Sequence, residues 1–156
     1  MPAPTQSRRN VRIDSEKYLI RTIESYDASD RWASWMSDPE AMHMLNLRAR
    51  SWIKADVVDY IKRFDQQSSL LLGIFDKQNG MHIGIFTVDI KQVQGKFLVN
   101  LLIGEPEYRN KHVTSSIAMP FRDYFFETLG LKMAMASVLA RNAKFVQNRG
   151  VCLKSR

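Results

Sequence analysis

Residues 103–117, IGEPEYRNKHVTSSI, join an apolar run to a pattern with helical spacing. Apolar side chains recur at every fourth position after the polar turn, at Val113, Ile117, Phe121 and Phe125. This period predicts a helix. A strand that enters a helix through a tight turn leaves backbone N–H groups unpaired, and these attract an anion. Arg109 and Lys111 supply positive charge at this point. A solvated basic turn without a ligand fits the same spacing.

Three apolar runs before this segment predict an antiparallel meander. They are SSLLLGIFD at 68–76, MHIGIFTVDI at 81–90 and KFLVNLLIG at 96–104. The links DKQNG and KQVQG are short enough for hairpins. After the helix, KMAMASVLA at 132–140 predicts a strand that pairs in parallel with the third meander strand through a right-handed crossover. The middle of the chain is therefore expected to form one mixed sheet.

The N-terminal third predicts one strand and two helices. YLIRTI at 18–23 has the composition of a strand. Asp27 or Ser29 is expected to cap a helix that ends before the Asp38-Pro39 pair, because a residue that precedes proline is disfavoured in helical geometry. A second amphipathic helix is expected over 51–64, with Ser51 as its cap.

The predicted order is β-α-α-β-β-β-α-β-α, with the last helix at 142–150. This order describes an α+β fold built on a mixed sheet. Pro120 conflicts with the helix that follows the polar turn, because proline removes a backbone hydrogen bond and clashes with the carbonyl four residues earlier. We expect a kink near Ser116, or a helix that starts nearer Met119.

The net charge of +7 is concentrated at the two ends of the chain. Residues 1–12 contribute +3 and residues 141–156 contribute +5, whereas residues 13–140 hold 15 bases and 16 acids. A nucleic-acid groove needs a basic stripe on the folded body, so this distribution argues against nucleic acid as a partner. We expect a disordered basic arm at 1–12, a single domain at 13–151 and a tail at 152–156.

Other features exclude several classes of protein. The chain has no run of eighteen apolar residues and no signal-peptide pattern at its start, so no membrane partner is expected. Cys152 is the single cysteine, which together with these features favours a cytoplasmic location, and no base lies near it in the sequence to make it a nucleophile. His43 and His82 stand apart from other ligand types, so no metal site is predicted.

Four segments together resemble the GNAT superfamily of acetyl-CoA-dependent acetyltransferases, in its branch of ribosomal-protein N-acetyltransferases. They are DRWASWMSDPEAM, GIFDKQNGMHIGIFTVDI, IGEPEYRNKHVTSSI and DYFFETLGLKMAMASVLARNAKFV. The resemblance covers roughly residues 17–151. It implies a GNAT-like fold, acetyl-CoA as the co-substrate, and direct acyl transfer to a primary amine such as a protein N-terminus or a small-molecule amine.

In that family the turn holds the CoA pyrophosphate through backbone amides, with the pattern Arg-Gly-Lys-Gly-Val-Ala/Gly. Here the matching residues are Arg109, Asn110, Lys111, His112, Val113 and Thr114, and no glycine remains. Asn110 tolerates positive φ, whereas His112 adds a ring where the backbone must approach a phosphate. A protonated His112 would partly compensate by pairing with the phosphate. The resemblance also implies CoA contacts from Ile103 and Asn142, although Asn142 equally fits a helix N-cap.

The resemblance implies that a backbone N–H near Leu102 or Ile103 polarises the thioester carbonyl. Glu105 follows the same strand and is the first candidate for the base that takes the amine proton, and Asp89 is the second. An ordinary surface carboxylate is the alternative for each. The tyrosine acid of many relatives has no counterpart at 142–150.

The tryptophans of the two N-terminal helices allow two interpretations. Trp32, Trp35 and Trp52 fit the spacing of core residues. In the family, however, these helices wall the acceptor cleft, so the indoles could also contact the amine acceptor.

Relatives continue beyond a Gly-Phe with two further strands, but here only CLKSR follows Gly150-Val151. We therefore expect the last two strands to be missing or incomplete. The strand at 132–140 would then keep an open edge and form a homodimer. Two alternatives to an enzyme stay open. One is a non-catalytic GNAT-fold protein with weakened CoA binding that acts through association, and the other is a basic nucleic-acid- or ribosome-binding module.

Overall fold

A computed structural model describes residues 8–45, 47–48, 50–109, 111–138 and 152–155. Its strands form one sheet in the order of the sequence. They are β1 Arg12–Asp14, β2 Tyr18–Thr22, β3 Ser69–Asp76, β4 His82–Lys91, β5 Lys96–Ile103, β6 Met133–Val138 and β7 Cys152–Ser155. Neighbours from β1 to β5 are antiparallel, whereas β5, β6 and β7 are mutually parallel.

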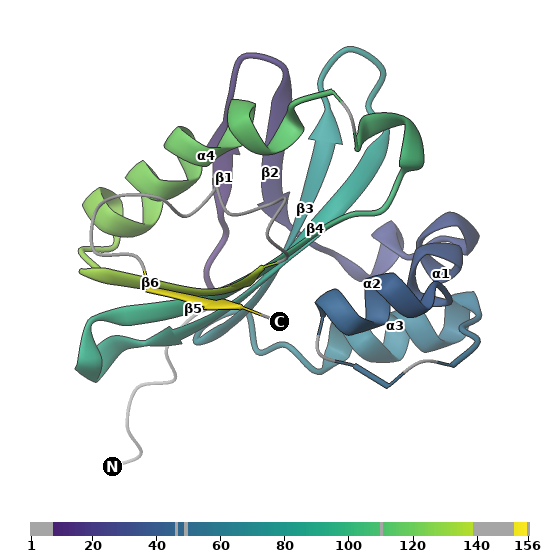
Figure 1. The fold of residues 1–156 in the computed structure, drawn as a ribbon, viewed down its shortest axis with the longest axis horizontal. Helices are drawn as coiled ribbons and strands as arrows, with labels where there is room; N and C mark the ends of the chain where they lie inside the picture. The colour runs from purple at the N-terminus through teal and green to yellow at the C-terminus, as the bar shows by residue number, and fades with distance from the viewer. Residues whose placement is uncertain (1–7, 46, 49, 110, 139–151, 156) are drawn as a thin grey trace.

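The helices lie on opposite faces of this sheet (Figure 1). One face carries α1 Asp30–Met36, α2 Pro39–Met44 and α3 Lys54–Lys62. The other face carries α4 Val113–Asp123, which continues as the π-helical turn η4 Tyr124–Thr128. Single 3-10 turns complete the fold at η1 Ser25–Asp27, η2 Gln92–Gln94 and η3 Pro106–Tyr108. Within the described residues, none of these helices has both the length and the apolar character needed to cross a bilayer.

Two apolar cores result because alternate strand residues point to opposite faces. On the α4 face, Phe86 of β4 and Phe97 of β5 pack with Phe121 and Phe125 of the helix. On the other face, Leu71, Ile85 and Leu102 pack under α1 and α3, with the three tryptophans. Burial of this apolar area is the main force that holds the helices on the sheet.

The predicted meander and crossover are confirmed. β3, β4 and β5 pair in sequence order, and the DKQNG turn closes with Gly80 at φ 74° and its N–H bonded to the Asp76 carbonyl. β6 pairs in parallel with β5 after α4. Gly130 ends the helical segment at φ 71°, a conformation that glycine adopts at little cost.

The predicted disordered arm at 1–12 is wrong for its described part, residues 8–12. Val11 is buried and its N–H donates to Thr22 Oγ1, and the N–H of Arg9 donates to the Gln66 carbonyl. Arg12 begins β1. The polar composition concealed this strand, because Ile13 is its only buried apolar residue and Val11, just before it, is the only apolar neighbour that is also buried among residues 8–12. Residues 1–7 of the predicted arm lie outside the described residues.

The N-terminal helices differ from the predictions at two places. Ser29 caps α1 by accepting from Trp32 N–H, as expected, but Asp38 then caps the unpredicted helix α2, which has Pro39 at its first position. Proline is favoured there because its missing N–H would be unpaired in any case. Helix α3 begins at Lys54 rather than near Ser51, since Asp56 accepts from the Ile53 N–H.

Pro120 lies inside α4, and the alternative start near Met119 is wrong because the helix begins at Val113. Pro120 is the eighth residue of α4 and has no backbone N–H. The carbonyl of Ser116, four residues earlier, therefore lacks its usual helical donor. The irregular geometry appears later, as the π-helical turn η4 that follows Asp123. A hydrogen bond there runs from the Leu129 N–H back to the Tyr124 carbonyl, five residues earlier.

The expectation of a bare edge on β6 is also wrong. Residues predicted to be a tail form β7, whose register places Cys152 opposite Met135 and Ser155 opposite Val138. Figure 1 shows β7 in yellow alongside β6. One C-terminal strand is therefore present and covers the edge through which we expected a dimer. The predicted last helix at 142–150 falls outside the described residues.

Candidate functional site

The parallel strands β5 and β6 diverge halfway along β5. β6 pairs with the first half of β5, from Lys96 to Val99. The same register would bring Asn100 opposite Ser137, but the pairing of β5 with β6 stops at Val99 and Ala136, while β6 continues to Val138 with β7 along its other edge. Among the described residues, the outer edge of β5 therefore has no strand partner from Asn100 to Ile103. Unpaired backbone groups in such an edge are available to a ligand.

The direction of the backbone N–H groups along β5 distinguishes Leu102 from Ile103, the two residues predicted to polarise the thioester carbonyl. Gly104 N–H donates to the Ile83 carbonyl of β4 over 2.8 Å. Because backbone groups alternate in direction along a strand, the N–H of Leu102 also faces β4, where Leu102 pairs with Ile85. The N–H of Ile103 faces the opening. Ile103 is thus better placed than Leu102 for the role that we predicted near this position.

The start of α4 has the backbone shape that the predicted phosphate turn requires. His112 adopts the left-handed conformation, with φ 57° and ψ 31°, and is exposed. No side chain among the described residues caps the helix, so the first N–H groups, from Val113 onward, remain available to an anion. Thr114 is half-buried. Asn110, predicted to bind the cofactor, lies outside the described residues.

Arg109 contacts the end of β5. Its Nε donates to the Ile103 carbonyl over 3.0 Å and its Nη2 donates to the Gly104 carbonyl over 3.3 Å. The same guanidinium lies 4.0 Å from Asp38 at the start of α2. These contacts show a structural role for Arg109 in fixing the turn against β5 and α2.

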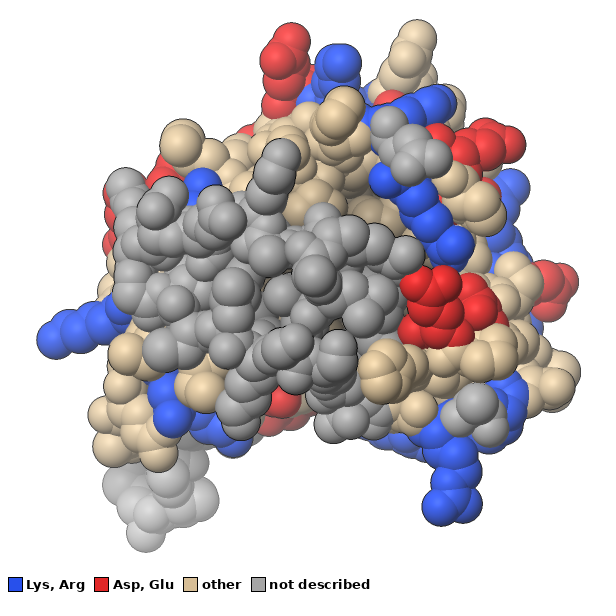
Figure 2. Space-filling view, viewed as in Figure 1, with Lys and Arg blue, Asp and Glu red and all other residues tan. Residues whose placement is uncertain are grey.

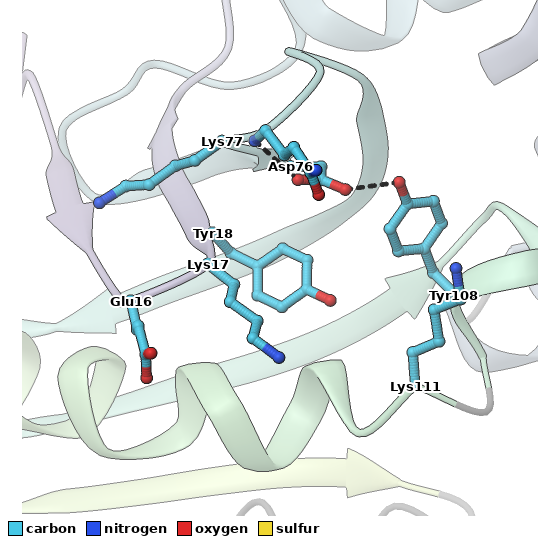
Figure 3. A pocket seen from close by; sticks show the side chains of 8 residues that line it. Glu16, Lys17, Tyr18, Asp76, Lys77, Tyr108 and Lys111 are labelled. Atoms are coloured by element: carbon cyan, nitrogen blue, oxygen red, sulfur yellow. Dashed lines mark hydrogen bonds between the residues drawn. The ribbon is translucent and has the colours of Figure 1, made fainter.

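Lys111 faces a different region, a cavity of about 640 Å³ beside α4 (Figure 3). Its Nζ lies 4.9 Å from the centroid of the Tyr108 ring. Tyr108 OH donates to Asp76 over 2.6 Å and accepts from Asn79 over 3.2 Å, which fixes η3 on the β3–β4 turn. The hydrogen bond to Asp76 raises the pKa of Tyr108, because it stabilises the protonated phenol. The two basic residues of the turn thus point to different surroundings.

Glu105 lies immediately beyond β5 and is held by α1. Its Oε1 accepts from the indole Nε1 of Trp35 over 3.0 Å and lies 3.3 Å from Arg31 Nε. The Glu105 side chain is 14% exposed. Asp89, the second candidate for the base, pairs with Leu98 near the other end of β5. The structure therefore places Glu105, and not Asp89, at the opening of the sheet.

The tryptophans and His82 make packing contacts with neighbouring side chains. Trp32, Trp35 and Trp52 are all buried in the core under α1 and α3. His82 lies between Phe75 and the rings of Trp32 and Trp35, and its Nε2 contacts the Gly84 carbonyl over 2.9 Å. In the part of the chain that the structure describes, no three His, Cys, Asp or Glu residues are grouped to hold a metal ion. Asn142 lies outside that part.

Charge is distributed without a dominant sign on the face seen in Figure 2. Basic and acidic side chains alternate around the described part of this face instead of forming one basic stripe. Several of the basic residues are paired with carboxylates, including Arg21 with Asp27 and Lys77 with Asp14.

Residues 17–147 match the model of the acetyltransferase (GNAT) domain. The chain belongs to this family. No protein of curated function matches the sequence. The GNAT match covers the opening between β5 and β6, the turn before α4 and Glu105.

Solved structures share the GNAT fold of this chain. An acetyltransferase of the GNAT family from Bacillus anthracis is 17% identical with a TM-score of 0.66, over 86% of this chain and 77% of that one. The ribosomal-protein-S5-alanine acetyltransferase from Vibrio fischeri is 19% identical, with a TM-score of 0.60, over 87% and 80%. Spermidine N-acetyltransferase from Vibrio cholerae, in complex with CoA and spermine, is 17% identical with a TM-score of 0.62, over 74% and 68%.

Sequence reasoning missed two features of this GNAT site. It gave no role to Trp35 beyond the core or the cleft wall, although its indole holds Glu105. It also gave no role to Gly104, on which that indole rests. The segment IGE, in which a glycine precedes an acidic residue at a strand end, was the available signal.

Proposed function

We propose that this GNAT protein transfers the acetyl group of acetyl-CoA directly to a primary amine, either a protein N-terminus or a small-molecule amine. One observation carries the proposal. Among the described residues, β5 has no outer strand partner from Asn100 to Ile103, and its end contacts the turn that leads into the uncapped start of α4 through Arg109 and the Ile103 carbonyl, so one extended ligand can reach both. A diphosphate suits the helix start, and the amides of a pantetheine arm suit an unpaired strand edge.

The chain's own residues divide the work of binding. Backbone N–H groups at Val113, Thr114 and Ser115 would hold the diphosphate. The backbone of Leu101 and the N–H of Ile103, which face the opening, would pair with the pantetheine amides and polarise the thioester carbonyl, whereas the Ile103 carbonyl already accepts from Arg109. His112 keeps the left-handed backbone that a glycine would adopt there, so the turn retains its shape although it has gained a ring.

The reaction needs one bond made and one broken. The amine nitrogen bonds to the thioester carbonyl carbon, and the bond from that carbon to sulfur breaks. An ammonium must first lose a proton, for which Glu105 is the acceptor at the opening. The nitrogen loses its second proton to the departing thiolate, which leaves as the thiol of CoA.

Two acceptor classes follow from the relatives. One solved GNAT structure is named as a ribosomal-protein-S5-alanine acetyltransferase and another as a spermidine N-acetyltransferase. A peptide that begins with alanine and the polyamine spermidine are therefore the first acceptors to test. We favour the peptide, because the sequence itself resembles the ribosomal-protein branch.

Calorimetric titration with acetyl-CoA, followed by a thiol-release assay with each acceptor, tests the proposal. We expect micromolar binding and acceptor-dependent release of CoA. His112→Gly serves as the companion variant. Binding only after this substitution would support the non-catalytic GNAT-fold alternative. Absence of binding by both proteins would refute the use of acetyl-CoA.

A further inference from the structure

Trp35 is wedged in a fixed orientation at the end of β5. A Cβ built on Gly104 would lie 2.0 Å from Cδ2 of the indole, so the ring rests directly on the glycine backbone. The ring also packs against His82 and Trp32, with centroid distances of 5.0 Å and 6.4 Å. With only 4% of its surface exposed, Trp35 has little room to rotate. The direction of its Nε1–H is therefore set by three surrounding groups, Gly104, His82 and Trp32.

That N–H donates to one oxygen of Glu105. Trp35 Nε1 lies 3.0 Å from Oε1, and the shortest contact of Arg31 is to the same oxygen. No described residue donates a hydrogen bond to Oε2. The backbone of the same residue is also fixed, because the N–H groups of Gly104 and Glu105 both donate to the Ile83 carbonyl. The carboxylate is thus anchored through Oε1, and Oε2 has no hydrogen-bond donor among the described residues.

We propose that Trp35 is a positioning residue for acetyl transfer, which holds Oε1 of Glu105 so that Oε2 faces the acceptor amine. The inference rests on the proposed function, in which Glu105 takes a proton from the ammonium. An anchored carboxylate needs no reorientation before it accepts that proton, and correct placement of a base contributes strongly to its efficiency. Arg31 adds a second contact to the same oxygen, but it is half-exposed and weaker as an anchor.

The chain offers a matched control on the same helix. Trp32 is also buried in α1 and packs on His82, but its Nε1 has no hydrogen-bond partner among the described residues. Trp35→Phe and Trp32→Phe remove the same atoms from the same core. Only Trp35→Phe removes a hydrogen bond to Glu105, and it also changes the ring that rests on Gly104.

We expect Trp35→Phe to lower kcat about tenfold or more while the KM for acetyl-CoA stays within about twofold. Trp32→Phe should keep kcat within about threefold. Thermal unfolding of both variants checks that they are folded and similarly destabilised. Equal losses of kcat in the two variants, or a Trp35→Phe protein as active as the parent, would overturn the inference.

A double-mutant cycle with Glu105→Gln separates positioning from general stability. If Trp35 acts through Glu105, adding Trp35→Phe to Glu105→Gln should cause little further loss of kcat. Losses that multiply would show that Trp35 acts independently of Glu105 and would reject the proposal. An unsubstituted chain that transfers no acetyl group refutes the proposed function and the inference with it. An active chain with an additive cycle refutes the inference alone.

Discussion

The backbone of His112 has a φ of 57°, a left-handed conformation that costs a residue with a Cβ about 1 kcal/mol. We predict that His112→Gly raises the free energy of unfolding by about 0.5–1 kcal/mol, because relief of this strain outweighs the extra freedom that glycine gives the unfolded chain. Urea unfolding measures the change. His112→Ala is the matched control, since it removes the ring but keeps the Cβ. Equal stability of the Gly and Ala variants would contradict the assignment of strain to this backbone.

His82 gives the fold a pH dependence. Burial against the surrounding rings lowers the pKa of His82 to about 4, from an ordinary value of 6.5. Between these values the unfolded state binds a proton that the folded state does not. The free energy of unfolding should therefore fall as the pH drops from 6.5 toward 4, by up to about 3 kcal/mol. Above pH 6.5 the residue contributes no slope.

Comparison with His82→Gln isolates this effect from the carboxylates that titrate nearby. Urea unfolding at pH 7, 6, 5 and 4 should show a shallower loss in the variant. His43→Gln, at an exposed position of α2, controls for the loss of an imidazole elsewhere in the fold. If the free energy of unfolding falls equally with pH in the parent and in His82→Gln, the pKa of His82 is not lowered by folding.

At the scale of elements, the closest approach of α1 to the end of β5 depends on Gly104, on which the Trp35 ring rests. We predict that Gly104→Ala lowers the free energy of unfolding by about 2 kcal/mol or more, because its Cβ would overlap the Trp35 ring. Gly80→Ala is the comparison, since nothing lies near that Cβ and only its φ of 74° is strained. The cost of Gly104→Ala should shrink in a Trp35→Ala background. If Gly104→Ala costs as much stability in the Trp35→Ala background as in the parent protein, the added Cβ does not overlap the Trp35 ring.

The sequence predicted the elements whose apolar period is regular. The runs around Leu71, Ile85 and Leu101 gave the meander, and the four-residue spacing after Val113 gave α4. Elements with few buried residues were missed or misplaced. β1 buries only Ile13, and α2 depends on the local chemistry of Asp38 and its proline rather than on a period. β7 depends on pairing with β6, which local sequence cannot report.

The same division holds for the candidate site. The sequence predicted Glu105 and the turn before α4, because both adjoin a recognisable strand or helix. It did not separate Leu102 from Ile103, since the direction of an N–H depends on the register between β4 and β5. Nor could it show that Arg109 contacts the end of β5 or that Trp35 holds Glu105. These contacts join residues through tertiary packing, and the Trp35 contact spans 70 positions.

For the whole molecule, β7 determines how the sheet ends. We predict that a chain truncated after Val151 has a lower free energy of unfolding and associates through the exposed edge of β6, because unpaired strand edges template pairing with another chain. Light scattering across a range of protein concentrations measures the association. Lys154→Pro within the full chain is a milder test, since it removes only one backbone N–H from β7. A truncated chain that stays monomeric at every concentration, with unchanged stability, would show that β7 contributes nothing to closing this edge. Dimers of both the full and the truncated chain would instead place the interface outside the β6 edge.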